Sequence, residues 1–326
     1  MSKKKTWQIV LWIVLVIMSV LMVLVVLNKQ WILDYWRSQI YQPTSEVARM
    51  RDKLALTSEG EFLFNASWPE LNNSDDFNSN CRFDMDAEVA VLGCYADGNI
   101  YVFDIQNEEL DGIRELTMAH ELLHAAYGRM TESEKNSLSL MLDEVYQANK
   151  EAFDGDIGLY DNREKSEEIY VRAGTEFREL PEPLERHYAK YFIDQDKIVD
   201  YYNKYISVFR GVKAELDVLS GEMEGLRQEI EQKTENYKTR ATQLEAEITS
   251  FNTCAETEGC FSNNFDFYTR RNVLVTEQDA LNVMYDELNG LINQYNEKVE
   301  KYNENAIYSE KLNNMINSLT KVEELE

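Results

Sequence analysis

The sequence predicts an α+β fold in three parts: one N-terminal transmembrane helix, a mostly helical domain with a small antiparallel sheet, and an antiparallel coiled-coil hairpin. Three observations support this division. Residues 7–28 are almost entirely apolar, residues 29–205 combine helical periodicity with two short β-rich runs, and residues 206–326 follow a heptad pattern without Pro. With 326 residues, the chain is long enough for one or two domains with a hydrophobic core.

The net charge of the chain is −26 at pH 7. Such a charge repels phosphate backbones and anionic membrane surfaces and favours solubility. The composition therefore argues against nucleic acid as a partner.

The apolar run from Trp7 to Leu27 is interrupted by only two polar residues. About 20 apolar residues span a bilayer, so the run predicts an uncleaved membrane anchor rather than a signal peptide, whose apolar core is typically about 7–15 residues long. The three lysines within residues 1–6 outnumber the basic residues just beyond the anchor, Lys29 and Arg37. We therefore expect a single-pass protein of the cell membrane with a short cytoplasmic tail and all later domains outside the cytoplasm.

The four cysteines fall into two local pairs, Cys81 with Cys94 and Cys254 with Cys260. An even, locally paired set outside the membrane predicts two disulfides that close short loops. Neither pair has the spacing of about two to four residues that is typical of a zinc knuckle. Four reduced, buried thiols are the alternative.

The early part of the domain is predicted to contain a helix over residues 41–56 and a strand that runs into a loop over residues 63–76. Two β-rich runs follow, Glu88–Cys94 and Asn99–Ile105, and they flank Ala96-Asp97-Gly98. Because Asp-Gly is typical of the tight turn between two antiparallel strands, these runs predict a β-hairpin.

The most specific motif is His120-Glu121-Leu122-Leu123-His124, which lies in an apolar helical stretch. On a helix, residues four apart lie on one face, so His120 and His124 can bind one metal ion while Glu121 lies beside the vacant coordination positions. Zinc bound in this way lowers the pKa of a water molecule, and a carboxylate can take that water's proton. The motif therefore predicts zinc as the cofactor and Glu121 as the general base. In the alternative, both histidines are ordinary polar positions of an amphipathic helix.

A catalytic zinc ion usually has three protein ligands, so one more is expected downstream of the motif. A second helix carries Glu168 and Glu176, and the only other histidine of the chain is His187. The residues themselves leave these three side chains open as the third ligand. Glu167 and Glu179 are expected to be solvated, because most acidic residues of so acidic a chain lie at the surface.

Glu168 is followed by small residues on the same helix and then by Leu180-Pro181. In this respect the chain resembles the gluzincin zinc peptidases of the thermolysin-like clan, over about residues 41–205. The resemblance implies a zincin-like domain with Glu168 as the third zinc ligand. The gap between the motif and Glu168 is longer than in thermolysin itself, so the resemblance is to the clan. Residues 174–192 also resemble uncharacterised membrane-anchored bacterial proteins.

The same resemblance implies two further features. The clan often supplies a His or Tyr that donates a hydrogen bond to the oxyanion, a stabilisation worth about 2.7–4 kcal/mol per donor, and His187 is the candidate here. A strand close before the motif helix commonly binds an extended peptide along the sheet edge, which makes residues 99–105 the candidate substrate strand. A helix residue without a catalytic role and a plain structural hairpin are the respective alternatives.

Beyond residue 206, apolar residues recur at spacings of three, four or seven in two segments separated by residues 252–268. Two such arms around a short loop predict an antiparallel coiled-coil hairpin whose tip is closed by Cys254 and Cys260. The hairpin could act as a spacer, an oligomerisation element or a partner-binding arm, and a simple scaffold is the alternative. Its charged positions favour no particular partner.

Together these features predict a membrane-anchored, extracytoplasmic zinc metallopeptidase that cleaves peptide or protein substrates, with zinc on His120, His124 and Glu168. One alternative is a non-catalytic cell-envelope protein that uses the hairpin to bind a partner. Another is a cell-wall hydrolase or its activator. A site with three protein ligands and an open position fits the enzyme, whereas four protein ligands would not.

Overall fold

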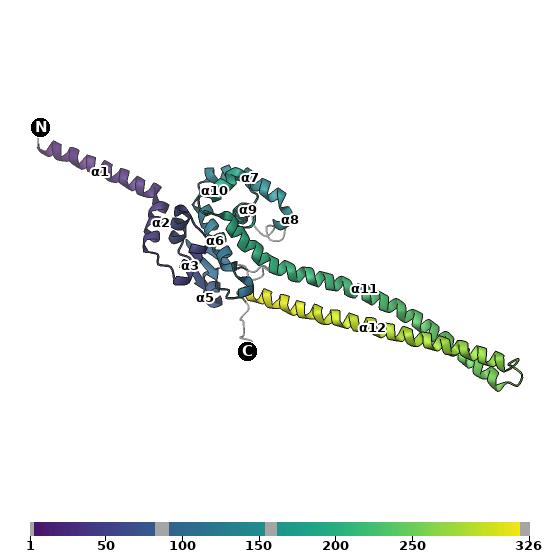
Figure 1. The fold of residues 1–326 in the computed structure, drawn as a ribbon. Helices are drawn as coiled ribbons and strands as arrows, with labels where there is room; N and C mark the ends of the chain where they lie inside the picture. Colours follow the sequence, from purple (N-terminus) through teal and green to yellow (C-terminus); the bar gives the residue numbers. More distant parts are fainter. Residues whose placement is uncertain (1–2, 82–90, 154–161, 320–326) are drawn as a thin grey trace. The chain divides into compact units, whose positions relative to one another are not determined.

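The structure, a computed structural model, is mostly helical, with one small sheet and one long helix pair (Figure 1). It describes residues 3–81, 91–153 and 162–319. The first two residues of the predicted tail lie outside the described residues, as do residues 88–90 of the first predicted hairpin strand.

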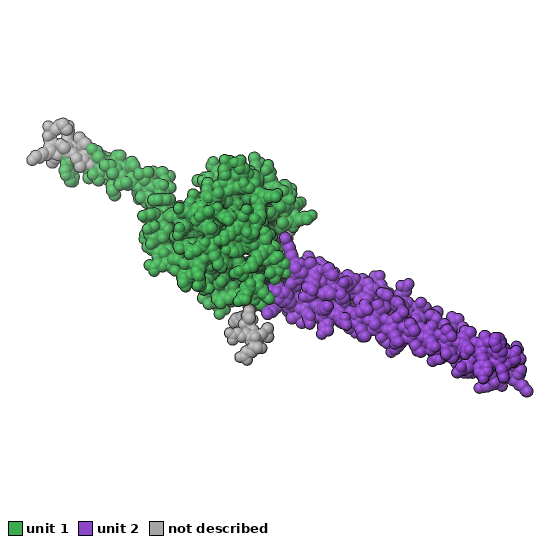
Figure 2. Space-filling view, in the orientation of Figure 1, with its two compact units in different colours: residues 1–208, 313–326 green, residues 209–312 purple. Residues whose placement is uncertain are grey.

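The chain divides into two compact units (Figure 2). The first comprises residues 1–208 and 313–326, and the second comprises residues 209–312. The sequence prediction assigned all of residues 206–326 to the hairpin. In the structure, residues 313–319 group with the first unit, where Ser318 hydrogen bonds with Asn78.

The chain begins with α1 (Lys3–Leu27), which is followed after one residue by α2 (Lys29–Ile40). Within the described part of the chain, no single helix meets the length and hydropathy needed to cross a membrane. The segments Leu11–Leu27 and Lys29–Ile40 together reach the required length and hydropathy, and the two helices are bent by 70° relative to each other. The predicted anchor is therefore helical, and its insertion into a membrane stays a prediction.

Two short helices precede the sheet, α3 (Ser45–Lys53) and α4 (Ser58–Ala66). The second corrects the sequence prediction, which placed a strand here beginning at Leu63. The Thr57 side chain accepts a hydrogen bond from the Gly60 backbone N–H and so caps α4 at its N-terminus. This cap and the burial of the apolar side chains of α4 stabilise a helix in this segment, although its local sequence predicts a strand.

The sheet has three strands in the order β1-β3-β2: β1 (Glu70–Asn72), β2 (Gly93–Ala96) and β3 (Asn99–Phe103). The predicted hairpin is confirmed, because β2 and β3 pair antiparallel with Asp97 and Gly98 in the left-handed conformation at the turn. β1 pairs with β3 in parallel, so the sheet is mixed, and the prediction of a purely antiparallel sheet is wrong.

The parallel pairing follows from the long connection between β1 and β3, which contains α5 (Ser74–Asn80) and β2 and returns the chain to the same end of the sheet. β3 is the central strand, and its backbone groups pair on both sides. Residues 99–105 therefore cannot bind an extended peptide along an open edge, and that prediction is wrong. Among the described residues, β2 is an edge strand that also packs against α6 (Ile113–Arg129).

The motif helix α6 lies in the core of the first unit, between the sheet and α9 (Asn162–Glu176). Most of its residues are buried, including Leu122 and Leu123, which are fully buried. The first unit also contains a short 3-10 helix and four further helices: η1 (Glu108–Leu110), α7 (Glu132–Ala148), α8 (Lys150–Phe153), α9 (Asn162–Glu176) and α10 (Glu182–Tyr188).

The close approach of α6 and α9 depends on Gly174. A Cβ at this position would lie 2.5 Å from Leu123 Cδ1 and 2.7 Å from Tyr188 Cε1. The tyrosine cannot move freely, since its hydroxyl donates a hydrogen bond to the Tyr170 carbonyl oxygen at 2.6 Å. Glycine at this position therefore lets α9 lie against the motif helix without displacing either side chain.

Gly174→Ala is expected to lower the free energy of unfolding by about 1–3 kcal/mol, the usual cost of overpacking a core. Thermal unfolding followed by circular dichroism measures the change. Gly221→Ala is the control, because nothing lies within 4 Å of a Cβ there. On that helix the added methyl group is expected to stabilise by about 0.5–1 kcal/mol. Equal stability of both variants would contradict the packing described here.

Both predicted disulfides are confirmed. Cys81 at the end of α5 is bonded to Cys94 on β2, and Cys254 is bonded to Cys260. The described residues contain no free cysteine.

The second unit is an antiparallel pair formed by long stretches of α11 (Gln195–Glu256) and α12 (Asn264–Ile316). Three ion pairs join the two helices. As the residue number on α11 rises, the number of its partner on α12 falls, so the helices are antiparallel. These pairs are Glu222 with Lys298 at 2.6 Å, Lys233 with Glu287 at 3.0 Å and Arg240 with Glu277 at 2.8 Å. The predicted hairpin of two helical arms is present.

Candidate metal centre

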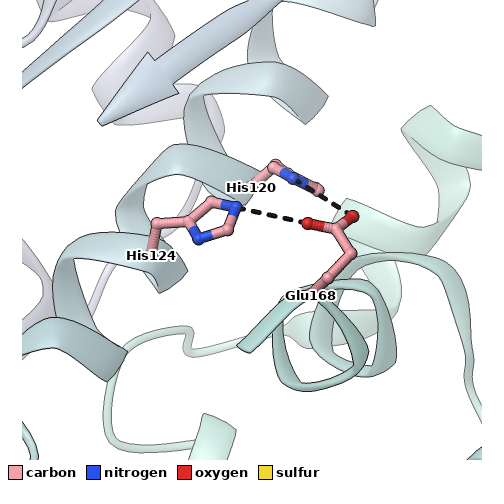
Figure 3. Close-up of side chains that lie close together, drawn as sticks. All are labelled: His120, His124 and Glu168. Atoms are coloured by element: carbon pink, nitrogen blue, oxygen red, sulfur yellow. Dashed lines mark ion pairs between the residues drawn. The ribbon is translucent and has the colours of Figure 1, made fainter. Parts of the chain in front are cut away.

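Three side chains from two helices converge in the first unit (Figure 3). α6 supplies His120 and His124, one turn apart on one face, and α9 supplies Glu168. The oxygens of Glu168 lie 3.8 Å from His120 Nε2 and 3.6 Å from His124 Nε2. One ligand atom from each residue lies within 4.8 Å of the other two. Of the three side chains that the sequence left open, Glu168 is the one that faces both histidines.

This geometry fits a zinc ion. In a tetrahedral zinc site with bonds of about 2.0–2.1 Å, the ligand atoms lie about 3.3 Å apart. One Glu168 oxygen lies 3.8 Å from His120 Nε2 and the other lies 3.6 Å from His124 Nε2. One atom from each of the three residues lies within 4.8 Å of the other two, a spacing somewhat wider than in a loaded site. The imidazole rings lie 5.0 Å apart at an angle of 62° and are not stacked on each other. Two imidazoles and one carboxylate are a common donor set for zinc, so these residues could hold the ion.

Glu121 follows His120 on α6 and is only 5% exposed. Strand β2 lies against it, since a Cβ on Gly93 would come within 2.7 Å of Glu121 Oε1. A hydrogen bond from the Tyr95 backbone also reaches this carboxylate. Burial raises the pKa of Glu121 to about 7, and the nearby charge of Glu168 adds to this effect. A carboxyl group with such a pKa can take up and release a proton near neutral pH.

The charges around the two imidazoles favour a cation. Burial alone would lower the pKa of His124, but its hydrogen bonds with Glu167 and Glu168 outweigh burial and raise it to about 10. Burial lowers the pKa of His120 to about 4. Burial alone would raise the pKa of Glu168, but the two histidines bring it down to about 2. Carboxylates thus surround the imidazoles, and this arrangement favours positive charge between them.

Glu167 contributes a contact that sequence reasoning missed. It was expected to be solvated, yet its Oε1 lies 2.9 Å from His124 Nδ1, the ring nitrogen that faces away from Glu168. A carboxylate on the second nitrogen of a metal-binding histidine fixes the ring orientation and the tautomer. The Glu167-Glu168 pair in the sequence was the available signal, because adjacent carboxylates on one helix can reach two atoms of one imidazole.

Glu167→Ala is expected to lower the affinity for zinc by about 10–100-fold, the usual effect of removing such a partner. Competition with a fluorescent zinc chelator measures the affinity. Glu167→Gln, whose amide oxygen can still accept a hydrogen bond from Nδ1, is expected to lose less. Glu179→Ala is the control, since Glu179 is exposed. An unchanged affinity in Glu167→Ala would contradict the assigned role.

His187 and Glu176 lie in other surroundings. His187 is 9% exposed and packs among tyrosines, with Nε2 at 3.0 Å from the Tyr170 hydroxyl and ring contacts to Tyr188 and Tyr191. Glu176 forms a bidentate pair with Arg172 at 2.8 and 3.0 Å. The metal group among the described residues includes neither of them. The structure thus gives no contact between His187 and the three candidate ligands.

The C-terminal end of α6 is held by a buried ion pair. Arg129 donates to both oxygens of Asp34 on α2, at 2.8 and 2.9 Å. The same guanidinium donates to the Tyr95 hydroxyl on β2 at 2.8 Å. Asp34 is 4% exposed. Burial alone would lower the pKa of Arg129, but the bond to Asp34 outweighs burial and raises it. The motif helix, the edge strand and α2 therefore meet at one guanidinium.

Comparisons with known proteins add no relatives: no protein-family model, no curated protein and no solved structure matches this chain.

Proposed function

We propose that this chain is a membrane-anchored, extracytoplasmic zinc peptidase with a zincin-like domain. The observation that carries the proposal is the convergence of His120, His124 and Glu168, whose ligand atoms lie within 4.8 Å of one another. Catalytic zinc sites have three protein ligands and an open position, whereas structural sites are closed by four. The group found among the described residues has three members. Both cysteine pairs are disulfides and supply no fourth ligand.

The buried carboxylate beside the site supports hydrolysis in particular. Zinc bound there would polarise the peptide carbonyl and lower the pKa of a bound water to about 7. Glu121 would take the proton of the attacking water and later deliver it to the leaving amine, which requires a carboxyl group that titrates near neutral pH. A purely structural metal site has no need of such a group.

An edge strand next to the site supports a peptide as the substrate. β2 packs on α6, and Gly93 of this strand lies against Glu121. An extended peptide can add to an exposed sheet edge through backbone hydrogen bonds. We assign this role to β2 in place of β3, which is paired on both sides.

The N-terminal helix supports the membrane anchor. α1 spans 25 residues and, from Leu11 to Leu27, its apolar side chains are about half exposed or more. A helix of this length rises about 38 Å at 1.5 Å per residue, and the apolar core of a bilayer is about 30 Å thick. The lysines in the first turn of α1 favour a cytoplasmic N-terminus, and the two disulfides suit an oxidising compartment outside the cytoplasm.

Metal content and hydrolysis of the purified full chain test the proposal. One zinc per chain is expected by elemental analysis, together with cleavage of a quenched fluorescent library of random peptides. A chelator should remove both, and added zinc should restore both. Glu168→Gln is expected to bind zinc more weakly, because a carboxamide is a poor zinc ligand, while Glu176→Gln keeps wild-type affinity. A wild-type chain that binds no zinc even when zinc is supplied would refute the proposal.

A partner-binding role for the hairpin is the second candidate function. In the second unit, Phe265 is 80% exposed and Tyr268 is 59% exposed, close to the disulfide Cys254–Cys260. Exposed aromatic side chains are frequent in protein interfaces. A non-catalytic envelope protein would bind its partner through this surface even when the zinc site is abolished. Two results together would favour this function: the Glu168→Gln variant still binds the partner, and the wild-type chain hydrolyses no peptide.

A further inference from the structure

One helix face in the first unit is apolar, aromatic and uncovered. On α2, the buried or half-buried side chains are Asp34, Arg37 and Ser38, which lie along one stripe of the helix. Most of the remaining surface is apolar and exposed. Its residues are Trp31 (61%), Ile32 (40%), Leu33 (43%), Tyr35 (51%), Trp36 (58%) and Ile40 (43%). A contiguous exposed patch of this kind typically marks an interaction site.

The inner stripe of α2 is attached firmly to the domain. Arg37 donates to the Ala66 carbonyl oxygen at 2.6 Å and to the Gly98 carbonyl oxygen at 3.0 Å. Its guanidinium also lies 4.6 Å from the centre of the Trp68 ring. Asp34 forms the buried pair with Arg129 described above. These contacts fix which face of α2 points outwards, so the apolar patch is a permanent feature of the domain surface.

α2 follows the proposed membrane helix directly, and its axis is bent by 70° from that of the segment before it. With α1 along the membrane normal, α2 would lie within about 20° of the membrane plane. Helices that lie in the interface carry tryptophan and aliphatic residues on the face that enters the lipid. We infer that α2 lies in the outer membrane–water interface, with its Trp31–Trp36 face in lipid. This inference rests on the proposed anchor.

The composition of the patch favours lipid over a second protein. Tryptophan and tyrosine are enriched at the level of the lipid headgroups, because there the apolar ring can contact lipid while the N–H or O–H group contacts water. Trp31 and Tyr35, whose rings stack at 5.5 Å, and Trp36 supply three such side chains on one helix. The net charge of −26 gives no attraction to anionic headgroups. The contact is therefore made by insertion of apolar side chains, without a requirement for charged lipids.

This placement brings the metal site near the bilayer. Arg129, which is bonded to α2 through Asp34, lies five residues after His124 on the same helix. Five residues of helix rise about 7.5 Å. The site is thus held close to the membrane surface, and the peptide segments within its reach are those near the bilayer.

Spin labels on the full chain in vesicles of a zwitterionic phospholipid test the inference. The native cysteines are all in disulfides, so a thiol-reactive nitroxide modifies only an introduced cysteine. Ile32→Cys and Trp36→Cys report on the patch, and Val20→Cys reports on α1. Leu140→Cys on α7 is the matched control, since Leu140 is apolar and 77% exposed. Collision rates with oxygen, which enters lipid, and with a polar nickel complex, which stays in water, are measured at each site.

Labels at Ile32 and Trp36 are expected to collide with oxygen several-fold more often, and with nickel several-fold less often, than the label at Leu140. Frequent collisions with nickel at both sites would overturn the inference. Protection from oxygen and nickel alike would also overturn it, because a protein would then cover the patch. If the label at Val20 is in lipid, these failures leave the anchor intact. If that label is in water, the anchor and the inference fail together. The proposed zinc site is unaffected by this result, because the zinc measurements test it independently.

Discussion

Glu121→Gln is expected to lower the rate of peptide hydrolysis by about 10²–10⁴-fold, the usual contribution of a general base. The carboxylate lies next to His120 on the motif helix, is 5% exposed, and has a pKa raised by burial to about 7. Glutamine keeps the size of the side chain and its hydrogen bond to the Tyr95 backbone but cannot accept the proton. Because Glu121 is not among the three candidate ligands, the variant is expected to keep one zinc per chain.

The matched control for this experiment is Glu115→Gln. Glu115 is a second buried carboxylate on the same helix, 2% exposed, and it accepts a hydrogen bond from Lys53 at 2.7 Å. Its loss is expected to affect stability rather than the rate of the folded, zinc-loaded protein. Comparable rates for Glu121→Gln and wild type at equal zinc content would rule out Glu121 as the base.

Asp34→Ala is expected to lower the free energy of unfolding of the first unit by about 3–5 kcal/mol, because it leaves Arg129 buried without its counter-charge. The pair is bidentate, at 2.8 and 2.9 Å, and the side chains are only 6% and 15% exposed. Denaturation followed by tryptophan emission measures the change selectively. All five tryptophans lie between residues 7 and 68, so this signal reports on the first unit alone.

Asp200→Ala serves as the comparison for a surface pair. Asp200 pairs with Arg178, and the two side chains are 67% and 44% exposed. Exposed pairs contribute at most about 1 kcal/mol, so this variant is expected to unfold almost like wild type. If Asp34→Ala were no less stable than Asp200→Ala, α2 would not be held to the motif helix as the structure indicates.

The sequence determined those features that depend on neighbours along the chain. The four-residue spacing of His120 and His124 sufficed to predict one metal-binding face, since helix geometry brings such residues together in any fold. The turn at Asp97-Gly98 and the short loops closed by the disulfides followed from local spacing in the same way. The heptad repeat predicted the two helical arms.

Only the tertiary structure decided which carboxylate meets the histidines. Glu168 and Glu176 lie on the same helix, two turns apart, and nothing in the local sequence says which turn faces α6. The contact at Gly174 sets how closely α9 approaches, and the bond between Arg172 and Glu176 withdraws the second carboxylate. The contact of Glu167 with His124 depends on the same packing of α9 against α6.

The sheet and α4 were likewise decided by contacts distant in sequence. β1 joins β3 through residues about thirty positions apart, Glu70 with Tyr101, and this pairing makes β3 central and the sheet mixed. α4 is a helix because Thr57 caps it and its apolar side packs into the core, although its local sequence permits a strand. The energy of such contacts depends on residues far away in the sequence, which a local pattern does not identify. Helix periodicity, by contrast, brings together residues that are close in the sequence, so the sequence alone identifies them.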